Sequence, residues 1–128
     1  MKILLDTHVF LWASLEPHRL SRSMRKHLED SENELVMNAA SVWEIGTKYA
    51  LNKLDLLLPP DVFVPQQTML LNIQVVPLTL AHALWAHQLP PHHRDPFDRM
   101  IIAQAVSERL PIMTSDAAFN AYKVRILA

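Results

Sequence analysis

Two aspartates, Asp95 and Asp98, stand three residues apart in the stretch HRDPFDRMIIAQA, at the start of an expected buried helix. Asp95 followed by Pro96 suits a helix N-cap with proline at the first helical position, because the Asp side chain accepts bonds from unpaired helical N–H groups. Asp98 would then lie in the first turn, where the helix dipole favours a negative charge by at most about 1 kcal/mol. This small structural benefit leaves room for a chemical role of Asp98.

Three further acids follow expected strands. Asp6 ends the run KILLD, Asp116 ends PIMTSD, and Glu44 lies in SVWE, in the first turn of the helix expected after ELVMN. In an open parallel sheet the carboxyl ends of the strands lie at one edge, and ligands bind there. We therefore expect Asp6, Glu44, Asp98 and Asp116 to converge at one rim of the protein.

Each of these acids also has a purely structural interpretation. Asp6 and Asp116 could cap the helices that follow them. Ser41 and Glu44 have the spacing of a capping box, in which Ser41 accepts a bond from the third helical N–H and Glu44 reaches back to the cap. Neither role requires catalysis, and one residue can serve either purpose.

Four carboxylates in one cleft repel one another, which raises their proton affinity and destabilises the fold unless a cation offsets their charge. Carboxylate oxygens favour hard divalent ions, so Mg²⁺ or Mn²⁺, octahedral and partly hydrated, is the expected occupant. Such an ion lowers the pKa of a bound water and stabilises charge that develops on a phosphorane. The acids therefore indicate metal-dependent chemistry at a phosphate ester.

The elements that must position these acids alternate along the chain. Expected strands are Lys2–Leu5, Glu34–Asn38, Ile73–Leu78, Pro111–Asp116 and, more weakly, Lys123–Leu127. Expected helices are His8–Ser14, Ser21–Ser31, Ser41–Lys53, Pro65–Leu71, Thr79–His87 and Phe97–Leu110. Strands that alternate with helices predict an α/β fold, with a parallel sheet covered by helices on both faces.

Composition narrows the class of protein. A chain of 128 residues with 50% hydrophobic and 20% charged residues suits one soluble domain. There is no cysteine, no apolar run of membrane-spanning length and no signal peptide, so we expect a cytoplasmic protein without thiol chemistry. Gly46 is the single glycine, which removes the phosphate-binding loops of Walker and Rossmann type.

The motifs LLDTH, SVWEI, RDPFDRMIIAQA and TSD, in this order and at these distances, span nearly the whole chain. Together they resemble the PIN-domain ribonucleases, and most closely the VapC-type toxins of type II toxin–antitoxin pairs. The resemblance implies a single PIN domain over 1–128, with a three-layer α/β/α fold and a central parallel sheet of four to five short strands. It also implies an Mg²⁺- or Mn²⁺-dependent endoribonuclease that cleaves RNA with a metal-activated water. The implied partners are RNA, a cognate antitoxin and a second copy of the chain.

The resemblance assigns roles position by position. The family's metal-binding and catalytic acids match Asp6, Glu44 and Asp98, with a more variable fourth acid at Asp116. Hydroxyl residues that could orient a carboxylate or a bound water match Thr7 and either Thr114 or Ser115. Asp95 and Arg99 belong to the DPFDR form of the motif and are expected to support the site rather than bind the metal.

The formal net charge of −1 means that RNA must bind through a local strip of cations. Candidates are Arg19, Arg22, Arg25, Lys26, Lys48, Lys53, Arg94 and Arg99. Within this set, the run RLSRSMRKH also suits a solvated helix face, which is the simpler interpretation.

Other classes of site and function fit the sequence less well. The seven histidines show no usual zinc-ligand pair at His82/His87 or His92/His93, although His8, His92 and His93 lie near the rim. The tryptophans Trp12, Trp43 and Trp85 occur in helical patterns and are expected in the core. A receiver-like or phosphatase-like domain would need a second acid beside Asp6, and a non-catalytic module would need no acid beyond the caps.

Overall fold

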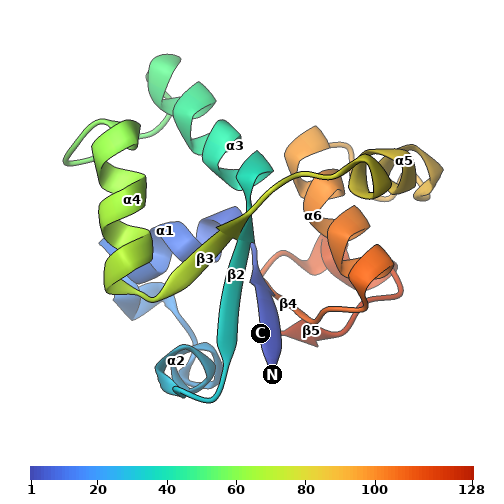
Figure 1. Ribbon diagram of the computed structural model, residues 1–128, viewed down its shortest axis with the longest axis horizontal. Coiled ribbons are helices and arrows are strands. Elements are labelled where there is room, and N and C mark those ends of the chain that lie inside the picture. Colours follow the sequence, from blue (N-terminus) through green and yellow to red (C-terminus); the bar gives the residue numbers. More distant parts are fainter.

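A five-stranded sheet in the order β3-β2-β1-β4-β5 runs through the centre of the protein, and every neighbouring pair of strands is parallel (Figure 1). The computed structural model describes all residues from Met1 to Ala128. The strands are β1 (Lys2–Leu5), β2 (Glu34–Asn38), β3 (Ile73–Val76), β4 (Ile112–Met113) and β5 (Ile126–Leu127).

Helices cover both faces of this sheet. They are α1 (Thr7–Leu15), η1 (Pro17–Arg19), α2 (Arg22–Glu29), α3 (Ala39–Ala50), α4 (Pro60–Leu70), α5 (Leu80–Gln88), α6 (Pro96–Glu108) and η2 (Ala117–Ala121). The expected three-layer α/β/α architecture with four to five short parallel strands is confirmed. None of the helices combines the length and the hydrophobicity needed to cross a lipid bilayer.

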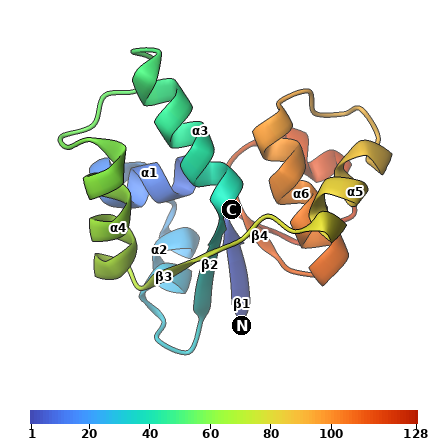
Figure 2. The same cartoon turned by 45° about the horizontal axis from the view of Figure 1, so that its top comes forward.

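The side chains of β1 alternate between two hydrophobic cores, because successive residues of a strand point to opposite faces. Ile3 and Leu5 pack with residues of α1, α2, α3 and α4, whereas Leu4 packs with α6 and η2. All three side chains are fully buried. Figure 2 shows the two groups of helices on either side of the sheet. The core is thus divided by the central strand, which also carries Asp6 at its carboxyl end.

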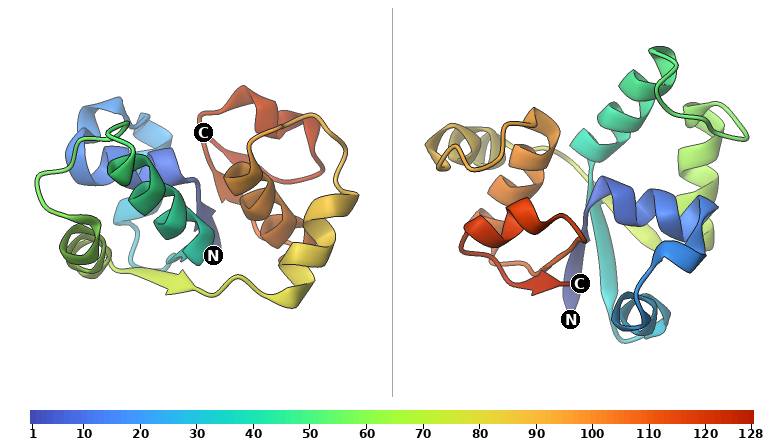
Figure 3. Two further views of the ribbon diagram at one scale, coloured as in Figure 1. Left: turned by 90° about the horizontal axis from the view of Figure 1, so that it is seen from above. Right: turned by 180° about the vertical axis from the view of Figure 1, so that it is seen from behind.

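The order of the strands places the end of β1 at a switch point. From β1 the chain builds outward through β2 and β3 on one side, and through β4 and β5 on the other. Seen from above in Figure 3, α1 and α3 lie on one side of the sheet, and α6 and η2 lie on the other. Crevices at such switch points are the usual ligand sites of open α/β sheets.

Helices α3 and α4 begin more than one residue earlier than the sequence patterns predicted. α3 begins at Ala39, and its N-cap is Asn38, whose side chain accepts a bond from the N–H of Ala40. The predicted capping box of Ser41 and Glu44 is therefore wrong, and both residues lie inside the helix. α4 begins at Pro60 and contains Pro65.

The prediction that the tryptophans lie in the core holds only for Trp12, which packs against the larger core cluster. Trp43 is 68% exposed and Trp85 41% exposed. The ring of Trp43 meets the edge of Phe97 at a centroid distance of 5.2 Å, close to the expected rim. Helical spacing alone did not distinguish the core face of α3 from the face beside the rim.

Candidate metal centre

Asp6 lies at the carboxyl end of β1, almost completely buried, and caps α1. Its Oδ1 accepts a bond from the N–H of His8 at 3.3 Å, and its Oδ2 accepts a bond from the hydroxyl of Thr114 at 2.7 Å. Burial raises the pKa of Asp6 above its usual range, and these bonds offset only part of that effect. Asp6, just after β1, and Thr114, just after β4, therefore form a hydrogen-bonded pair at the edge of the sheet.

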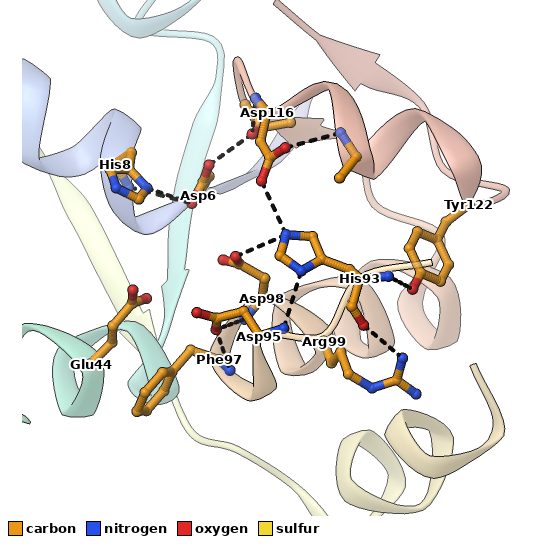
Figure 4. Close-up of polar contacts among 12 residues, drawn as sticks. Asp6, His8, Glu44, His93, Asp95, Phe97, Asp98, Arg99, Asp116 and Tyr122 are labelled. Atoms are coloured by element: carbon orange, nitrogen blue, oxygen red, sulfur yellow. Dashed lines mark hydrogen bonds and ion pairs between the residues drawn. The ribbon is translucent and has the colours of Figure 1, made fainter. Parts of the chain in front are cut away.

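Asp95 and Asp98 have different contacts at the start of α6. The Oδ1 of Asp95 accepts bonds from the N–H groups of Phe97 at 2.8 Å and Asp98 at 3.1 Å, so Asp95 is the helix cap that the sequence predicted. The carboxylate of Asp98 takes no part in the cap and points toward Asp6 and Asp116 (Figure 4). Burial, followed by repulsion from Asp6, Asp95 and Glu44, raises the pKa of Asp98 to about 7.

Glu44 approaches the same edge from the interior of α3 and is 1% exposed. Its Oε2 pairs with the ammonium group of Lys48, one turn further along the helix. Burial alone would lower the pKa of Lys48, but the bond and charge of Glu44 raise it. The second oxygen of Glu44, Oε1, is buried without any hydrogen-bond partner. An orphaned carboxylate oxygen of this kind is costly unless a ligand satisfies it.

Asp116 is the most exposed of the candidate acids, with a side chain that is 40% exposed. Its Oδ1 caps η2 by accepting a bond from the N–H of Ala118 at 2.9 Å, and its Oδ2 lies 3.0 Å from Nε2 of His93. Burial alone would raise the pKa of Asp116, but the bonds from Ala118 and His93 outweigh it and lower that pKa.

The residues expected to support the acids occupy different environments. The hydroxyl of Thr7 donates to Ser41 Oγ at 2.8 Å in a buried contact, and that of Thr114 also accepts the N–H of Asp116 at 3.0 Å. Ser115 is exposed. The guanidinium of Arg99 donates to backbone carbonyls of the preceding helix and loop, those of Ala86, Leu89, Pro90 and His93. Arg99 thus fastens the loop that leads into α6.

His93 and Lys48 contact the acids directly, although neither was among the predicted site residues. Nε2 of His93 lies 3.1 Å from Oδ2 of Asp98 as well as 3.0 Å from Asp116. The sequence placed His93 beside the rim, but it could not separate His93 from His92. For Lys48, a spacing of four residues from Glu44 on one helix is the only signal that could have revealed the contact.

These features fit a hard divalent cation. A ring nitrogen of His93 and one carboxylate oxygen each of Asp98 and Asp116 lie within 4.8 Å of one another, and Asp6 and Glu44 face the same space. Oε1 of Glu44 has no hydrogen-bond partner, and burial followed by repulsion from neighbouring acids raises the pKa of Asp98, so a bound cation would stabilise both carboxylates. Carboxylate oxygens are the donors that Mg²⁺ and Mn²⁺ prefer.

Comparison with known proteins identifies the family of this fold and acid arrangement. The PIN domain family model matches residues 3–124. The chain belongs to the PIN-domain family. The resemblance to PIN domains that the motifs indicated is thereby confirmed.

The chain is also similar to a named ribonuclease over most of its length, and to solved structures in its fold. The ribonuclease VapC22 of Mycobacterium tuberculosis is 30% identical over 122 residues, which cover 94% of this chain and 92% of the relative. Among solved structures, VapBC2 from Rickettsia felis, bound to a DNA fragment from its promoter, has a TM-score of 0.71 at 15% identity, with 98% and 97% of the two chains covered. VapBC-5 from Mycobacterium tuberculosis, a member of the VapBC family of toxin-antitoxin systems, has a TM-score of 0.62 at 17% identity, with 98% and 97% covered.

Proposed function

We propose that this PIN domain is an Mg²⁺- or Mn²⁺-dependent endoribonuclease that acts as the toxin of a toxin–antitoxin pair in the cytoplasm. The observation that carries the proposal is the convergence of four acids at the switch point of the sheet, where Asp6, Glu44 and Asp98 are buried and Asp116 is partly exposed. The 30% identity to a VapC ribonuclease supports RNA as the substrate. A receiver-like or phosphatase-like role has no comparable support.

Under this proposal Asp6, Glu44, Asp98 and Asp116 hold the cation. When bound, the cation supplies Lewis-acid activation of water and stabilises charge at the phosphorus. Thr114 holds the carboxylate of Asp6, and Thr7 and Ser115 lie beside the acids as lesser candidates for contact with substrate. Asp95 and Arg99 support the site through the start of α6.

We propose that RNA enters along a pocket of about 640 Å³ between α1 and α3. The pocket begins beside Thr7 and Glu44, and three cations of the expected strip line it, Arg19, Lys48 and Lys53. Such cations attract the phosphate backbone without regard to sequence. The cations Arg22, Arg25 and Lys26 belong to α2, which lies near the amino-terminal ends of the strands, so they suit the simpler role of a solvated helix face.

Cleavage of a structured RNA by the purified protein should require Mg²⁺ or Mn²⁺ and should stop when EDTA is added. The folded protein should also gain about 3 kcal/mol of stability at a metal concentration 100 times the dissociation constant, because the ion binds the folded state. Thermal unfolding with and without metal measures this gain. The Asp6→Asn, Asp98→Asn double variant is the control, and a metal response equal to that of the natural chain would contradict the proposed site.

We propose further that the chain forms a homodimer and that a segment of a cognate antitoxin covers the cleft. The solved VapBC relatives support the antitoxin. Exposed apolar side chains of α5 support a further protein contact, with Leu80 76% exposed, Leu84 52% and Trp85 41%. Light scattering at high micromolar concentration should give the mass of two chains. A strict monomer under these conditions would count against the dimer.

A further inference from the structure

His93 lies beside two candidate metal ligands, Asp98 and Asp116, and both its backbone and its ring are held by further contacts. Its backbone N–H donates to the hydroxyl of Tyr122 at 2.8 Å, and its carbonyl accepts a bond from Arg99 at 3.1 Å. Its ring meets the edge of Phe119 at a centroid distance of 5.5 Å. The side chain is 13% exposed. A histidine of a mobile surface loop would have few of these contacts.

The hydrogen bond at Nδ1 decides which ring nitrogen of His93 carries the proton. Nδ1 lies 3.2 Å from the backbone N–H of Asp95 and accepts a bond from it, because that N–H can only donate. In the neutral ring the proton must then reside on Nε2. Nε2 therefore donates to Oδ2 of Asp116 at 3.0 Å, and the same nitrogen lies 3.1 Å from Oδ2 of Asp98.

This N–H group joins acids from two separate elements. Asp98 stands on α6, whereas Asp116 stands at the start of η2 with a side chain that is 40% exposed. Apart from His93, Asp116 is held only through Oδ1, by the N–H of Ala118. Without the donor, nothing in the contacts of Asp116 would keep its Oδ2 turned toward Asp98.

We propose that His93 is a positioning residue of the metal site, whose Nε2–H binds Oδ2 of Asp116 and lies against Oδ2 of Asp98, so that both carboxylates face the same space. The inference rests on the proposed function, since it concerns the same site. Because Nε2 of His93 lies beside both oxygens, it keeps the two carboxylates turned toward the same space. Groups that orient metal ligands in this way commonly contribute 10- to 100-fold in metal affinity.

The same geometry argues against His93 as a metal ligand. A histidine binds a metal through a nitrogen lone pair, and the lone pair of the neutral ring lies at Nδ1, which faces the N–H of Asp95. The role is therefore to donate a hydrogen bond, which an amide can also do. Gln carries an N–H donor near the position of Nε2, whereas Phe fills the ring volume without any donor.

Calorimetric titration with Mg²⁺ and, separately, Co²⁺ tests this proposal on the purified full chain. His93→Phe should weaken the binding of both ions by about 10- to 100-fold and by similar factors, because it removes an orienting donor and no ligand. His93→Gln should recover most of the lost affinity. His92→Phe, a change at the exposed neighbour, should leave both affinities unchanged. Circular dichroism checks the fold of each variant, and His93→Asn, whose amide is too short to reach the acids, replaces His93→Phe if the latter does not fold.

The possible results separate three interpretations. Unchanged affinity in the variant without a donor would overturn the positioning role. Loss of Co²⁺ binding with retained Mg²⁺ binding would overturn it in favour of a nitrogen ligand, because imidazole favours transition metals. A natural chain that binds neither ion would overturn the proposed metal site itself, and the inference with it.

Discussion

Asp98→Asn should reduce RNA cleavage by about two to four orders of magnitude, which corresponds to about 3 to 5 kcal/mol of lost transition-state stabilisation. The substitution keeps the size of the side chain and removes a charged oxygen from the space between Asp6, Asp116 and His93. Divalent cations should therefore bind more weakly. Single-turnover cleavage at saturating RNA measures the loss without a contribution from substrate binding.

The same variant should be more stable than the natural chain when metal is absent and the pH is high. The pKa of Asp98 is raised to about 7 in the folded state, well above its usual value, so folding favours the protonated form. The metal-free natural chain should lose stability as pH rises from about 4 through 7, by a few kcal/mol. Asp98→Asn removes the part of this pH dependence that Asp98 contributes, and denaturant unfolding of both proteins in EDTA across that range measures the difference.

Asp95 provides the matched comparison, because it lies three residues away and carries the same charge. Asp95→Asn should keep most of the cleavage activity, since asparagine caps a helix about as well as aspartate, and Asp95→Ala should cost about 1 kcal/mol of stability. Equal loss of cleavage in both asparagine variants would give Asp95 a chemical role. Equal retention would remove Asp98 from the active site.

Arg99→Ala should lower the free energy of unfolding by about 2 to 4 kcal/mol, because one guanidinium donates to the carbonyls of Ala86, Leu89, Pro90 and His93. The carbonyls of Ala86 and Leu89 lie at the carboxyl-terminal end of α5, where a cation also complements the helix dipole. Cleavage should fall as well, since the released loop carries His93. Arg99→Lys should recover only part of the stability, because an ammonium group lacks the fork of donors.

Arg94→Ala is the control for this result, because Arg94 is an exposed cation of the same loop. It should change stability by no more than about 0.5 kcal/mol. If Arg99→Ala were as stable as Arg94→Ala, the carbonyl contacts would contribute nothing measurable. Retained stability with weaker RNA binding would instead assign Arg99 to the RNA strip.

Strand and helix patterns were enough to predict the architecture. Apolar runs such as KILL alternate with helical segments, and only a parallel sheet covered on both faces buries all of them. The N-caps at Asp6, Asp95 and Asp116 were also predictable, because capping depends on a side chain and the N–H groups two or three residues later. The start of α3 was not, since Asn38 ends β2 and also caps the helix, so the boundary depends on the strand as well.

The sequence by itself determined which acids lie at the rim, because the end of each parallel strand fixes the position of the residues just beyond it. It could not determine how the acids are held. His93 and Asp116 are 23 positions apart in the chain, and Thr114 and Asp6 are 108 apart. Arg99 binds carbonyls that lie 6 to 13 positions before it. These contacts depend on how α6, η2 and the loop pack against the sheet. No local sequence pattern encodes that packing. Only the tertiary structure therefore distinguishes His93, which lies beside the carboxylates of Asp98 and Asp116, from its exposed neighbour His92.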